Sequence, residues 1–420
     1  MLKRCLTVAG SDSGGGAGIE ADLKTFAATG TYGTVAVTAV TAQNTFEVRG
    51  IHAVPAKLVA QQIEAVADDI GIDAVKTGML ATAEIVEVVA ARIRDLGLPK
   101  LVVDPVMISK SKNRLLAEDA IEALKRYLLP LATVVTPNLE EAEVLSGKSI
   151  NGLPEMMDVA KTLHKLGSRY VIVKGGHLAT EILYDVLYDG QDYYVFPHHR
   201  IHTSSTHGTG CTFSAALASY LAQGDDIYVA TFKAQRFIRH ALANSLELGH
   251  GSGPTNHLAK LYEHSSKYQV WTRFREILSF LRRTRVHARM SLSLQFSMLA
   301  YPFCSPDDVC SLAGPIVVSD GYFHVTGVPS FGRPTPEGDV LLTLARKGLH
   351  FEGAWLLPAA LAGAIRQCGC TEVSDCPSFS PKAEASFTYY KICSESKEVC
   401  LLGQDAIALA VRLTKILNKI

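Results

Sequence analysis

Short apolar runs alternate with segments of helical periodicity over about the first 250 residues of the chain. The first apolar run is Cys5–Ala9. A helical pattern follows over Glu20–Ala28, and a second apolar run covers Tyr32–Ala42. Strands that alternate with helices in this way are typical of a parallel sheet with helices on its faces. We therefore predict an α/β fold for this part of the chain.

The same alternation continues along the chain. Further strands are predicted at Ala74–Gly78, Leu101–Asp104, Thr133–Thr136 and Tyr170–Lys174. In an open parallel sheet, ligands bind outside the carboxyl ends of the strands, so polar residues at strand ends are candidates for a site. The residues that meet this condition are Asp104, Asn138, Glu141 and Lys174.

The pattern divides the chain into three parts. Two helical segments, Thr212–Leu221 and Tyr228–Leu248, close a first domain at residues 1–257. Residues 258–289 are rich in basic side chains and helical in pattern, and we predict a helical linker there. Residues 290–420 carry shorter elements, among them a hairpin near residues 314–327 and a last helix over Asp405–Asn418, which predicts a smaller α/β domain.

Length and charge narrow the class of protein. A chain of 420 residues is too long for one ordinary core, in keeping with two domains. Its 41 basic and 41 acidic residues leave no net charge, so we expect no nucleic-acid partner and no anionic membrane partner. The N-terminus does not have a signal-peptide pattern, and no apolar run reaches the ~18 residues of a spanning helix. We expect a cytoplasmic enzyme.

Cysteine is concentrated in the last third of the chain. Cys368, Cys370 and Cys376 invite a metal interpretation, but their spacing is not that of paired zinc ligands. Reduced cysteines packed as small apolar groups suit a cytosolic chain better.

The segment Thr206–Cys211, which leads into an apolar helical pattern, is the most informative motif. The first N–H groups of a helix lack intrahelical partners, and the helix dipole favours negative charge there. A phosphoryl group could therefore be held at Gly208, Thr209 and Gly210. Cys211 would have a stabilised thiolate and could activate an attacking hydroxyl. The alternative is a tight turn followed by a small buried residue.

Three common motifs are absent: the Walker loop, the dinucleotide fingerprint after the first strand, and the hydrolase elbow. What remains is the helix start at Gly208–Cys211, called here the anion cradle, together with acidic residues at strand ends and Lys174. Phosphoryl transfer needs groups of these kinds. Glu141 and Asp104 are candidate Mg²⁺ ligands, with Asn138 near the nucleotide. The structural alternatives are an N-cap at Asn138, a capping-box acid at Glu141, a strand terminator at Asp104 and a solvated Lys174.

Seven motifs together resemble a known family: Ala9–Phe26, Thr41–Asn44, Lys76–Leu80, Asp104–Met107, Thr136–Asn138, Lys174–His177 and Thr206–Cys211. They occur in the order found in the hydroxymethylpyrimidine and phosphomethylpyrimidine kinases of thiamine biosynthesis. The resemblance covers residues 1–257. It implies a ribokinase-like three-layer sandwich with a mostly parallel central sheet, and a kinase that uses ATP and Mg²⁺ to phosphorylate an aminopyrimidine alcohol and then its monophosphate.

The resemblance also implies roles for single residues. Gln43 would pair with the aminopyrimidine edge, as an amide can donate and accept at once. The catalytic place falls to Cys211, with Gly208, Gly210 and Lys174 around it, and Thr209, Asn138 and Lys174 would contact ATP. Kinases of this fold often pair, so a homodimer is expected. Asp22, Gly10 and Met79 would form the wall of the substrate pocket.

Residues 290–420 resemble, more faintly, a thiamine-phosphate synthase domain that some microbes fuse to this kinase. The similar segments are Ser305–Val309, Gly314–Gly321 and Val325–Gly332. The family's histidine after the Phe-Gly turn is replaced by Arg333. We therefore expect a degenerate sensing or structural domain; an active synthase domain and an unrelated packing domain are the alternatives.

Alternative functions remain for the first domain. A pyridoxal kinase on the same scaffold is one, and a ligand sensor of the thiamine pathway is another. The loop Ser109–Arg114, with its three basic residues, is either a lid over the phosphates or a solvated basic loop.

Overall fold

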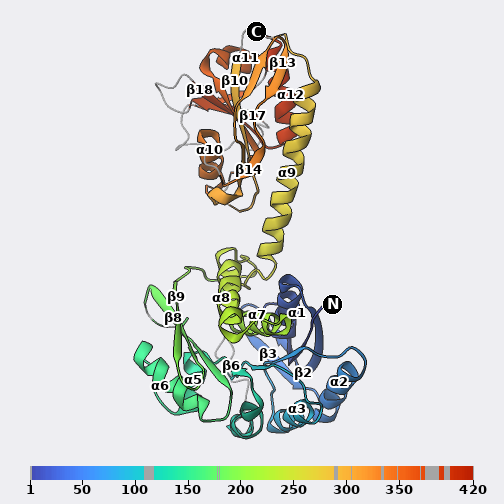
Figure 1. Cartoon of the computed structure of the whole chain (residues 1–420), viewed down its shortest axis with the longest axis vertical. Helices are drawn as coiled ribbons and strands as arrows, with labels where there is room; N and C mark the ends of the chain where they lie inside the picture. The colour runs from blue at the N-terminus through green and yellow to red at the C-terminus, as the bar shows by residue number, and fades with distance from the viewer. Residues whose placement is uncertain are drawn as a thin grey trace. The chain divides into compact units, whose positions relative to one another are not determined.

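The computed structural model describes residues 2–107, 118–176, 178, 180–287, 292–303, 305–332, 335–347, 349–368, 370–373, 387–391 and 398–419. The chain divides into two compact units, Met1–Lys260 (unit 1) and Leu261–Ile420 (unit 2) (Figure 1). Among these described residues, none of the helices has both the length and the apolar character needed to cross a bilayer.

Unit 1 is built on one nine-stranded sheet with the order β3-β2-β1-β4-β5-β6-β7-β8-β9. The six strands from β2 to β7 in this order pair in parallel, whereas β3, β8 and β9 are antiparallel. The strands are β1 (Arg4–Asp12), β2 (Tyr32–Gln43), β3 (Val48–Ala53), β4 (Ala74–Thr77), β5 (Leu101–Val103), β6 (Val134–Val135), β7 (Tyr170–Lys174), β8 (Ile182–Tyr188) and β9 (Tyr193–His199).

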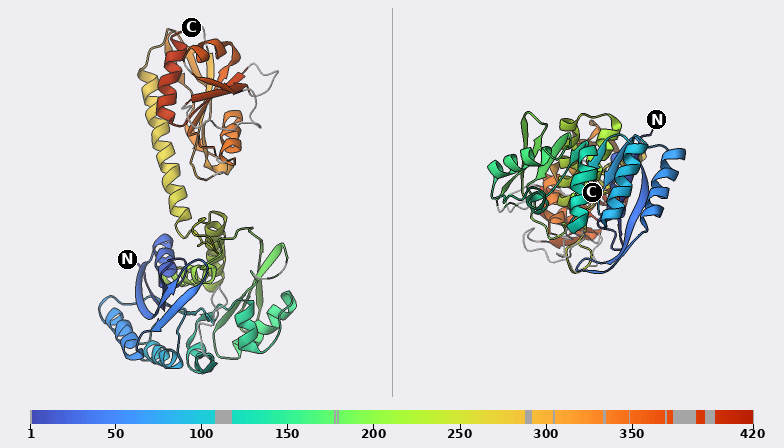
Figure 2. Two further views of the ribbon diagram at one scale, coloured as in Figure 1. Left: turned by 180° about the vertical axis from the view of Figure 1, so that it is seen from behind. Right: turned by 90° about the horizontal axis from the view of Figure 1, so that it is seen from below.

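Helices cover both faces of this sheet, because alternate residues of its central strands are buried on opposite sides (Figure 2). Leu6 and Val8 of β1 belong to one apolar cluster, and Cys5 belongs to the other. The first cluster packs against α2 (Ala56–Asp69), α3 (Ala83–Asp95), α4 (Glu118–Ala123), α5 (Leu139–Ser146) and α6 (Leu153–His164); the second packs against α1 (Gly18–Thr29), α7 (Thr209–Gln223) and α8 (Ile227–Ala243). The result is the predicted three-layer arrangement.

The predicted strands of unit 1 are all present, with ends that differ by a few residues from the predicted ones. The antiparallel strands β3, β8 and β9 were not predicted. The edge strands β3 and β9 are largely exposed and lack the continuous apolar runs that mark a buried parallel strand. β8 is mostly buried, but Asp185 interrupts its apolar run.

Unit 2 contains a second, mostly antiparallel sheet with the order β13-β12-β10-β15-β18-β17-β16; β11 also pairs with β10, and β14 pairs with β11. The predicted hairpin is formed by β12 and β13, and the predicted last helix is α12. The strands are β10 (Leu292–Leu299), β11 (Val309–Leu312), β12 (Ile316–Ser319), β13 (Tyr322–Val325), β14 (Pro329–Phe331), β15 (Gly353–Pro358), β16 (Thr371–Val373), β17 (Phe387–Lys391) and β18 (Glu398–Gly403); the helices are α9 (Ala259–Arg283), α10 (Pro336–Ala345), α11 (Ala362–Gln367) and α12 (Ala406–Leu417).

Helix α9 occupies most of the segment expected as a helical linker. One of its faces is buried with the sheet of unit 2, since Phe274 is fully buried and its ring centroid lies 5.0 Å from that of Phe296. Phe296 in turn stacks on Trp355 at 4.4 Å. The helix therefore contributes directly to the core of unit 2.

The cysteines of unit 2 do not form a metal site among the described residues, which contain no group of three or more histidine, cysteine or acidic side chains able to hold an ion. Cys368 and Cys370 are buried free thiols. Cys376 lies outside the part of the chain that the structure describes.

We predict that Phe274→Ala destabilises unit 2 by about 3–5 kcal/mol, because it leaves a cavity beside two packed aromatic rings. Both tryptophans of the chain, Trp271 and Trp355, lie in unit 2, so tryptophan fluorescence during urea unfolding reports on this unit. Phe232→Ala, at an exposed position of α8, is the matched control. An unchanged fluorescence midpoint in Phe274→Ala would contradict the packing of α9.

Candidate active site

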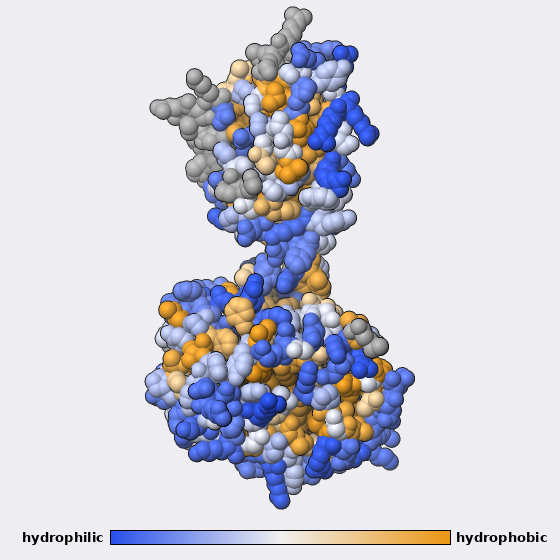
Figure 3. Space-filling model, in the orientation of Figure 1, coloured by the Kyte–Doolittle hydropathy of each residue, from blue (hydrophilic) through white to orange (hydrophobic). Residues whose placement is uncertain are grey.

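A cavity of about 610 Å³ opens at the carboxyl ends of the parallel strands of unit 1. It extends from β1 and β2 to β9 and α8. Figure 3 shows apolar residues in the middle of the visible face of this unit, with polar residues around them. The predicted site residues that line the cavity are Gly10, Gln43, Met79, Asp104, Asn138, Glu141, Lys174, Gly208, Thr209, Gly210 and Cys211.

Helix α7 points its N-terminus into this cavity through a glycine turn. Gly208 is the N-cap, in the left-handed region with φ of 79°. A Cβ atom at this position would lie 1.8 Å from the carbonyl oxygen of Gly16, so both the conformation and the close approach require glycine. No side chain caps the helix, and the first N–H groups, including those of Gly210 and Cys211, remain available to a ligand. The predicted anion cradle has the necessary geometry.

Lys174 and Asp104 form an ion pair beside the cradle, with Nζ and Oδ1 3.1 Å apart. The other carboxylate oxygen of Asp104 accepts a hydrogen bond from Ser214 of α7 at 3.1 Å. A Cβ atom at Gly210 would lie 3.3 Å from Lys174 Nζ, so the absence of a side chain brings the lysine close to the helix end. Burial opposes the charge of Lys174, but Asp104 and Glu141 outweigh it and raise the pKa of this lysine.

Asn138 and Glu141 form a capping box at the start of α5. The Glu141 N–H donates to Asn138 Oδ1 at 2.9 Å, and the Asn138 N–H donates to Glu141 Oε2 at 2.8 Å. The structural alternative for these residues is thus present, and both still line the cavity. Burial raises the pKa of Glu141 to about 8; Asp104 adds to this rise and Lys174 opposes it.

A buried ion pair that the sequence analysis missed lies below the cradle. Lys76 Nζ donates to Asp22 Oδ2 at 2.8 Å, and both side chains are fully buried. Lys76 lines the cavity, whereas Asp22 does not and lies behind its wall. The resemblance implied that Asp22 forms part of the pocket wall, but its side chain does not line the cavity. The available signal was a lysine inside the apolar strand Ala74–Thr77, where an unpaired charge would be costly.

Cys211 differs from the expectation in one respect. Burial raises the pKa of its thiol to about 11, and this effect outweighs the nearby positive charge of Lys76. The predicted stabilised thiolate is therefore wrong for the ligand-free protein, because desolvation of the charged form outweighs Lys76 and the hydrogen bond from the Gly18 N–H, which both lower the pKa.

The remaining predicted positions are Gly10, Met79 and the lid. A Cβ atom at Gly10 would lie 3.3 Å from Met79 Sδ, so these two residues pack together, and both line the same cavity as Gln43. The loop Ser109–Arg114 lies outside the described residues. At the opposite end the cavity is lined by residues that the sequence did not single out, among them Ile201, Gln235, Ile238, Arg239 and Leu242.

Comparison with known proteins identifies the family. Residues 12–256 match the family model described as Phosphomethylpyrimidine kinase. The chain belongs to the phosphomethylpyrimidine kinase family. The predicted family of thiamine biosynthesis, the phosphotransferase class and the ribokinase-like fold of unit 1 are thereby confirmed.

Individual relatives of the chain support the same family assignment. The hydroxymethylpyrimidine/phosphomethylpyrimidine kinase of Bacillus subtilis is 48% identical over 259 residues, which are 61% of this chain and 96% of that protein. The thiamine biosynthesis bifunctional protein ThiED of Geobacter sulfurreducens is 50% identical over 253 residues; the match covers 60% of this chain but only about half, 52%, of that protein. A solved ADP complex of Bacillus subtilis pyridoxal kinase has a TM-score of 0.59 at 42% identity, covering 62% of this chain and 99% of that chain.

We predict that Cys211 reacts slowly with iodoacetamide at neutral pH. A thiol with a pKa of about 11 is alkylated as its thiolate, so the rate should rise about tenfold per pH unit from pH 7 to pH 10 without a plateau. Peptide mapping by mass spectrometry separates Cys211 from the other cysteines, and Cys5, buried in the same unit, is the internal control. A rate that levels off below pH 8 would instead support a stabilised thiolate.

Proposed function

We propose that unit 1 transfers the γ-phosphoryl group of ATP to the hydroxymethyl group of 4-amino-5-hydroxymethyl-2-methylpyrimidine, and then phosphorylates the resulting monophosphate to the diphosphate. One observation carries this proposal. A single cavity joins Gln43, Gly10 and Met79 to the open N-terminus of α7. A pyrimidine held at the first group would present its alcohol to a phosphoryl group held at the second.

The nucleotide would occupy the rest of the cavity. Its apolar side chains near β9 and α8, Ile201, Ile238 and Leu242, suit the adenine ring, and the phosphates would extend toward the cradle. We propose that Thr209, Asn138 and Lys174, which line the same cavity, contact the nucleotide. This arrangement supports a nucleotide and an acceptor bound in line with each other.

Mg²⁺ fits the donor set of the site. Asp104 and Glu141 are two buried carboxyl groups that line the cavity beside Lys174. Mg²⁺ in kinases is held by one or two carboxylates together with water and the phosphates of the nucleotide. When bound, the ion supplies charge neutralisation on those phosphates. We propose that Asp104 and Glu141 hold it.

The protein's own groups would act on the acceptor and the phosphoryl group. The acceptor oxygen bonds to the γ-phosphorus, the bond from this phosphorus to the β–γ bridging oxygen breaks, and ADP leaves. N–H groups at Gly208, Gly210 and Cys211, with Lys76 and Lys174, would stabilise the charge that develops on the phosphoryl oxygens. We propose that the small thiolate fraction of Cys211, favoured by the adjacent Lys76, accepts the hydroxyl proton.

Pyridoxal is the second candidate substrate, because a pyridoxal kinase is 42% identical over the same part of the chain. It too carries a hydroxymethyl group on a methylated heteroaromatic ring. The expected homodimer and the sensing or structural role expected for unit 2 stay predictions.

The test compares the two acceptors. We expect the full chain with Mg-ATP to convert the aminopyrimidine alcohol to its diphosphate, seen by mass spectrometry, with a kcat/KM at least ~10-fold above that for pyridoxal. The Cys211→Ala variant is the control for unit 1, and addition of thiazole phosphate reports on unit 2 through thiamine phosphate. Efficient phosphorylation of pyridoxal with little pyrimidine product would overturn the proposed substrate.

A further inference from the structure

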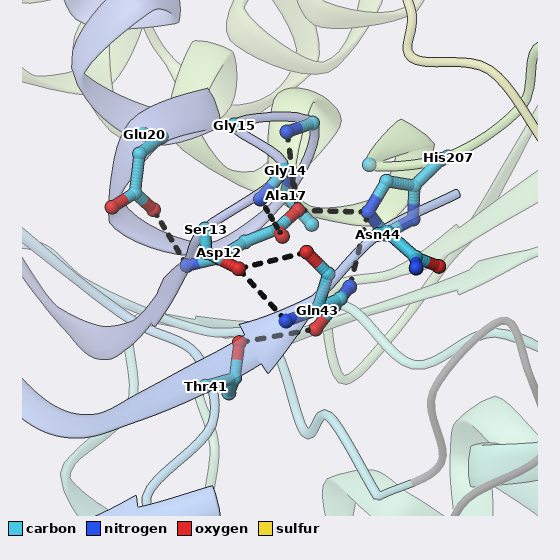
Figure 4. A network of polar contacts seen from close by, with 12 residues as sticks. Asp12, Ser13, Gly14, Gly15, Ala17, Glu20, Thr41, Gln43, Asn44 and His207 are labelled. Carbon is cyan, nitrogen blue, oxygen red and sulfur yellow. Dashed lines mark hydrogen bonds and ion pairs between the residues drawn. The ribbon is translucent and has the colours of Figure 1, made fainter. Parts of the chain in front are cut away.

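The glycine loop Ser13–Ala17, which joins β1 to α1, folds around one carboxylate (Figure 4). Asp12 Oδ1 accepts a hydrogen bond from the Gly14 N–H at 2.8 Å. The other oxygen, Oδ2, accepts from the Gly16 and Ala17 N–H groups at 3.1 and 2.9 Å. Asp12 is only 3% exposed, so water competes little for these bonds. The conformation of the glycine loop therefore depends on a single buried side chain.

The same carboxylate reaches the turn before α7, where Asp12 Oδ2 lies 2.8 Å from His207 Nε2. Burial opposes the charge of Asp12, but His207 and the loop N–H groups outweigh it and lower the pKa of this carboxyl group. An ionised carboxylate only accepts hydrogen bonds, so His207 Nε2 donates this one. The main chain of His207 is held as well, since its N–H donates to the Gly253 carbonyl at 3.0 Å and its carbonyl accepts from the Thr255 N–H at 3.2 Å. The glycine loop is thus tied to an anchored turn 195 positions further along the chain.

The two segments that this bond joins are in direct contact. A Cβ atom at Gly16 would lie 2.5 Å from His207 Cδ2. A Cβ atom at Gly208 would lie 1.8 Å from the Gly16 carbonyl oxygen, and this second overlap could be relieved only by moving the main chain of the loop. The Asp12–His207 hydrogen bond and this glycine contact together form a clasp between the glycine loop and the start of α7.

Both clasped segments lead directly to Cys211 and its hydrogen-bond partner. Helix α1 begins at Gly18, where φ is 58° and a Cβ atom would lie 2.3 Å from the Gly10 carbonyl oxygen, so this position requires glycine. The Gly18 N–H donates to the Cys211 thiol. Gly18 follows the loop directly, and Cys211 lies three residues after Gly208. A shift of the loop against the turn would therefore move this N–H away from the sulfur, on which it favours negative charge.

We propose that Asp12 and His207 are positioning residues for phosphoryl transfer, because the clasp keeps the Gly18 N–H on Cys211 Sγ. The two side chains act through Gly18 and Cys211 rather than on the reacting atoms. What the reaction needs at position 207 is a hydrogen-bond donor to Asp12, and not an acid or a base. The inference rests on the proposed role of Cys211 in the proposed function.

The test compares three replacements of His207 in the full chain, assayed with Mg-ATP and the aminopyrimidine alcohol. A glutamine side chain carries an N–H as many bonds from the main chain as Nε2 of histidine, whereas asparagine is one methylene shorter and leucine has no donor. We expect a kcat about 30-fold lower for His207→Leu and His207→Asn, since a misplacement of about 1 Å can cost ~100-fold in rate. His207→Gln should keep kcat within about threefold of the wild type, and KM for ATP should change less than about threefold in all three variants.

A second readout does not depend on activity. Hydrogen–deuterium exchange of the peptide that covers residues 11–18, measured by mass spectrometry on the ligand-free full chain, should be about tenfold faster in His207→Leu and close to the wild-type rate in His207→Gln. His202→Leu is the matched control, because this histidine is 73% exposed and does not line the cavity. It should leave both kcat and the exchange rate unchanged.

The glutamine and leucine variants separate the possible roles of the ring. Equally low kcat values would contradict the proposal and indicate proton transfer by the imidazole, and equally high values would contradict it and leave the ring a packing role. Unchanged exchange of residues 11–18 in His207→Leu would also contradict it. If the wild type phosphorylates no acceptor, the proposed function fails, whereas the exchange rates still decide whether the clasp exists. If His207→Leu does not fold, the polar His207→Asn variant decides by the same two readouts.

Discussion

The buried ion pair between Lys76 and Asp22 is the constraint on which unit 1 depends. Removing two charges from water costs several kcal/mol per ion, and the cost is offset only when the geometry of the pair is good. Here Nζ and Oδ2 are 2.8 Å apart, and Thr7 donates a further hydrogen bond to the same carboxylate oxygen at 2.6 Å. The pair therefore connects β4 and α1 and places a positive charge at the wall of the cavity.

Two features show that the surrounding chain is built to accommodate this charge. A Cβ atom at Gly78 would lie 2.8 Å from Lys76 Nζ, so the glycine that follows the strand leaves room for the ammonium group. Burial lowers the pKa of Lys76, but Asp22, Cys211 and Asp104 together raise it. Lys76 therefore stays protonated although it is buried. Its positive charge can interact with an anionic group bound at the N-terminus of α7.

Much of this arrangement could be predicted from the sequence, and the remainder could not for physical reasons. Continuous apolar runs predicted the central strands, and Gly208–Cys211 predicted the cradle, because backbone conformation and helix ends are local properties. The Lys76–Asp22 and His207–Asp12 pairs join residues 54 and 195 positions apart, and no local pattern reports such contacts. The prediction of a stabilised thiolate at Cys211 was wrong for a related reason. The position of a residue in a helix is a local property, whereas the burial that raises the pKa of Cys211 depends on the whole fold.

The central claim is that the buried pair serves phosphoryl transfer as well as folding, and a double-mutant cycle tests it most directly. Removal of one partner leaves an unpaired buried charge, so Lys76→Met and Asp22→Leu should each destabilise unit 1 by about 3–5 kcal/mol in urea unfolding followed by circular dichroism. The double variant should recover most of this stability, yet its kcat should stay at least ~100-fold below the wild type. A double variant with near-wild-type kcat would contradict the account and leave the pair a purely structural role.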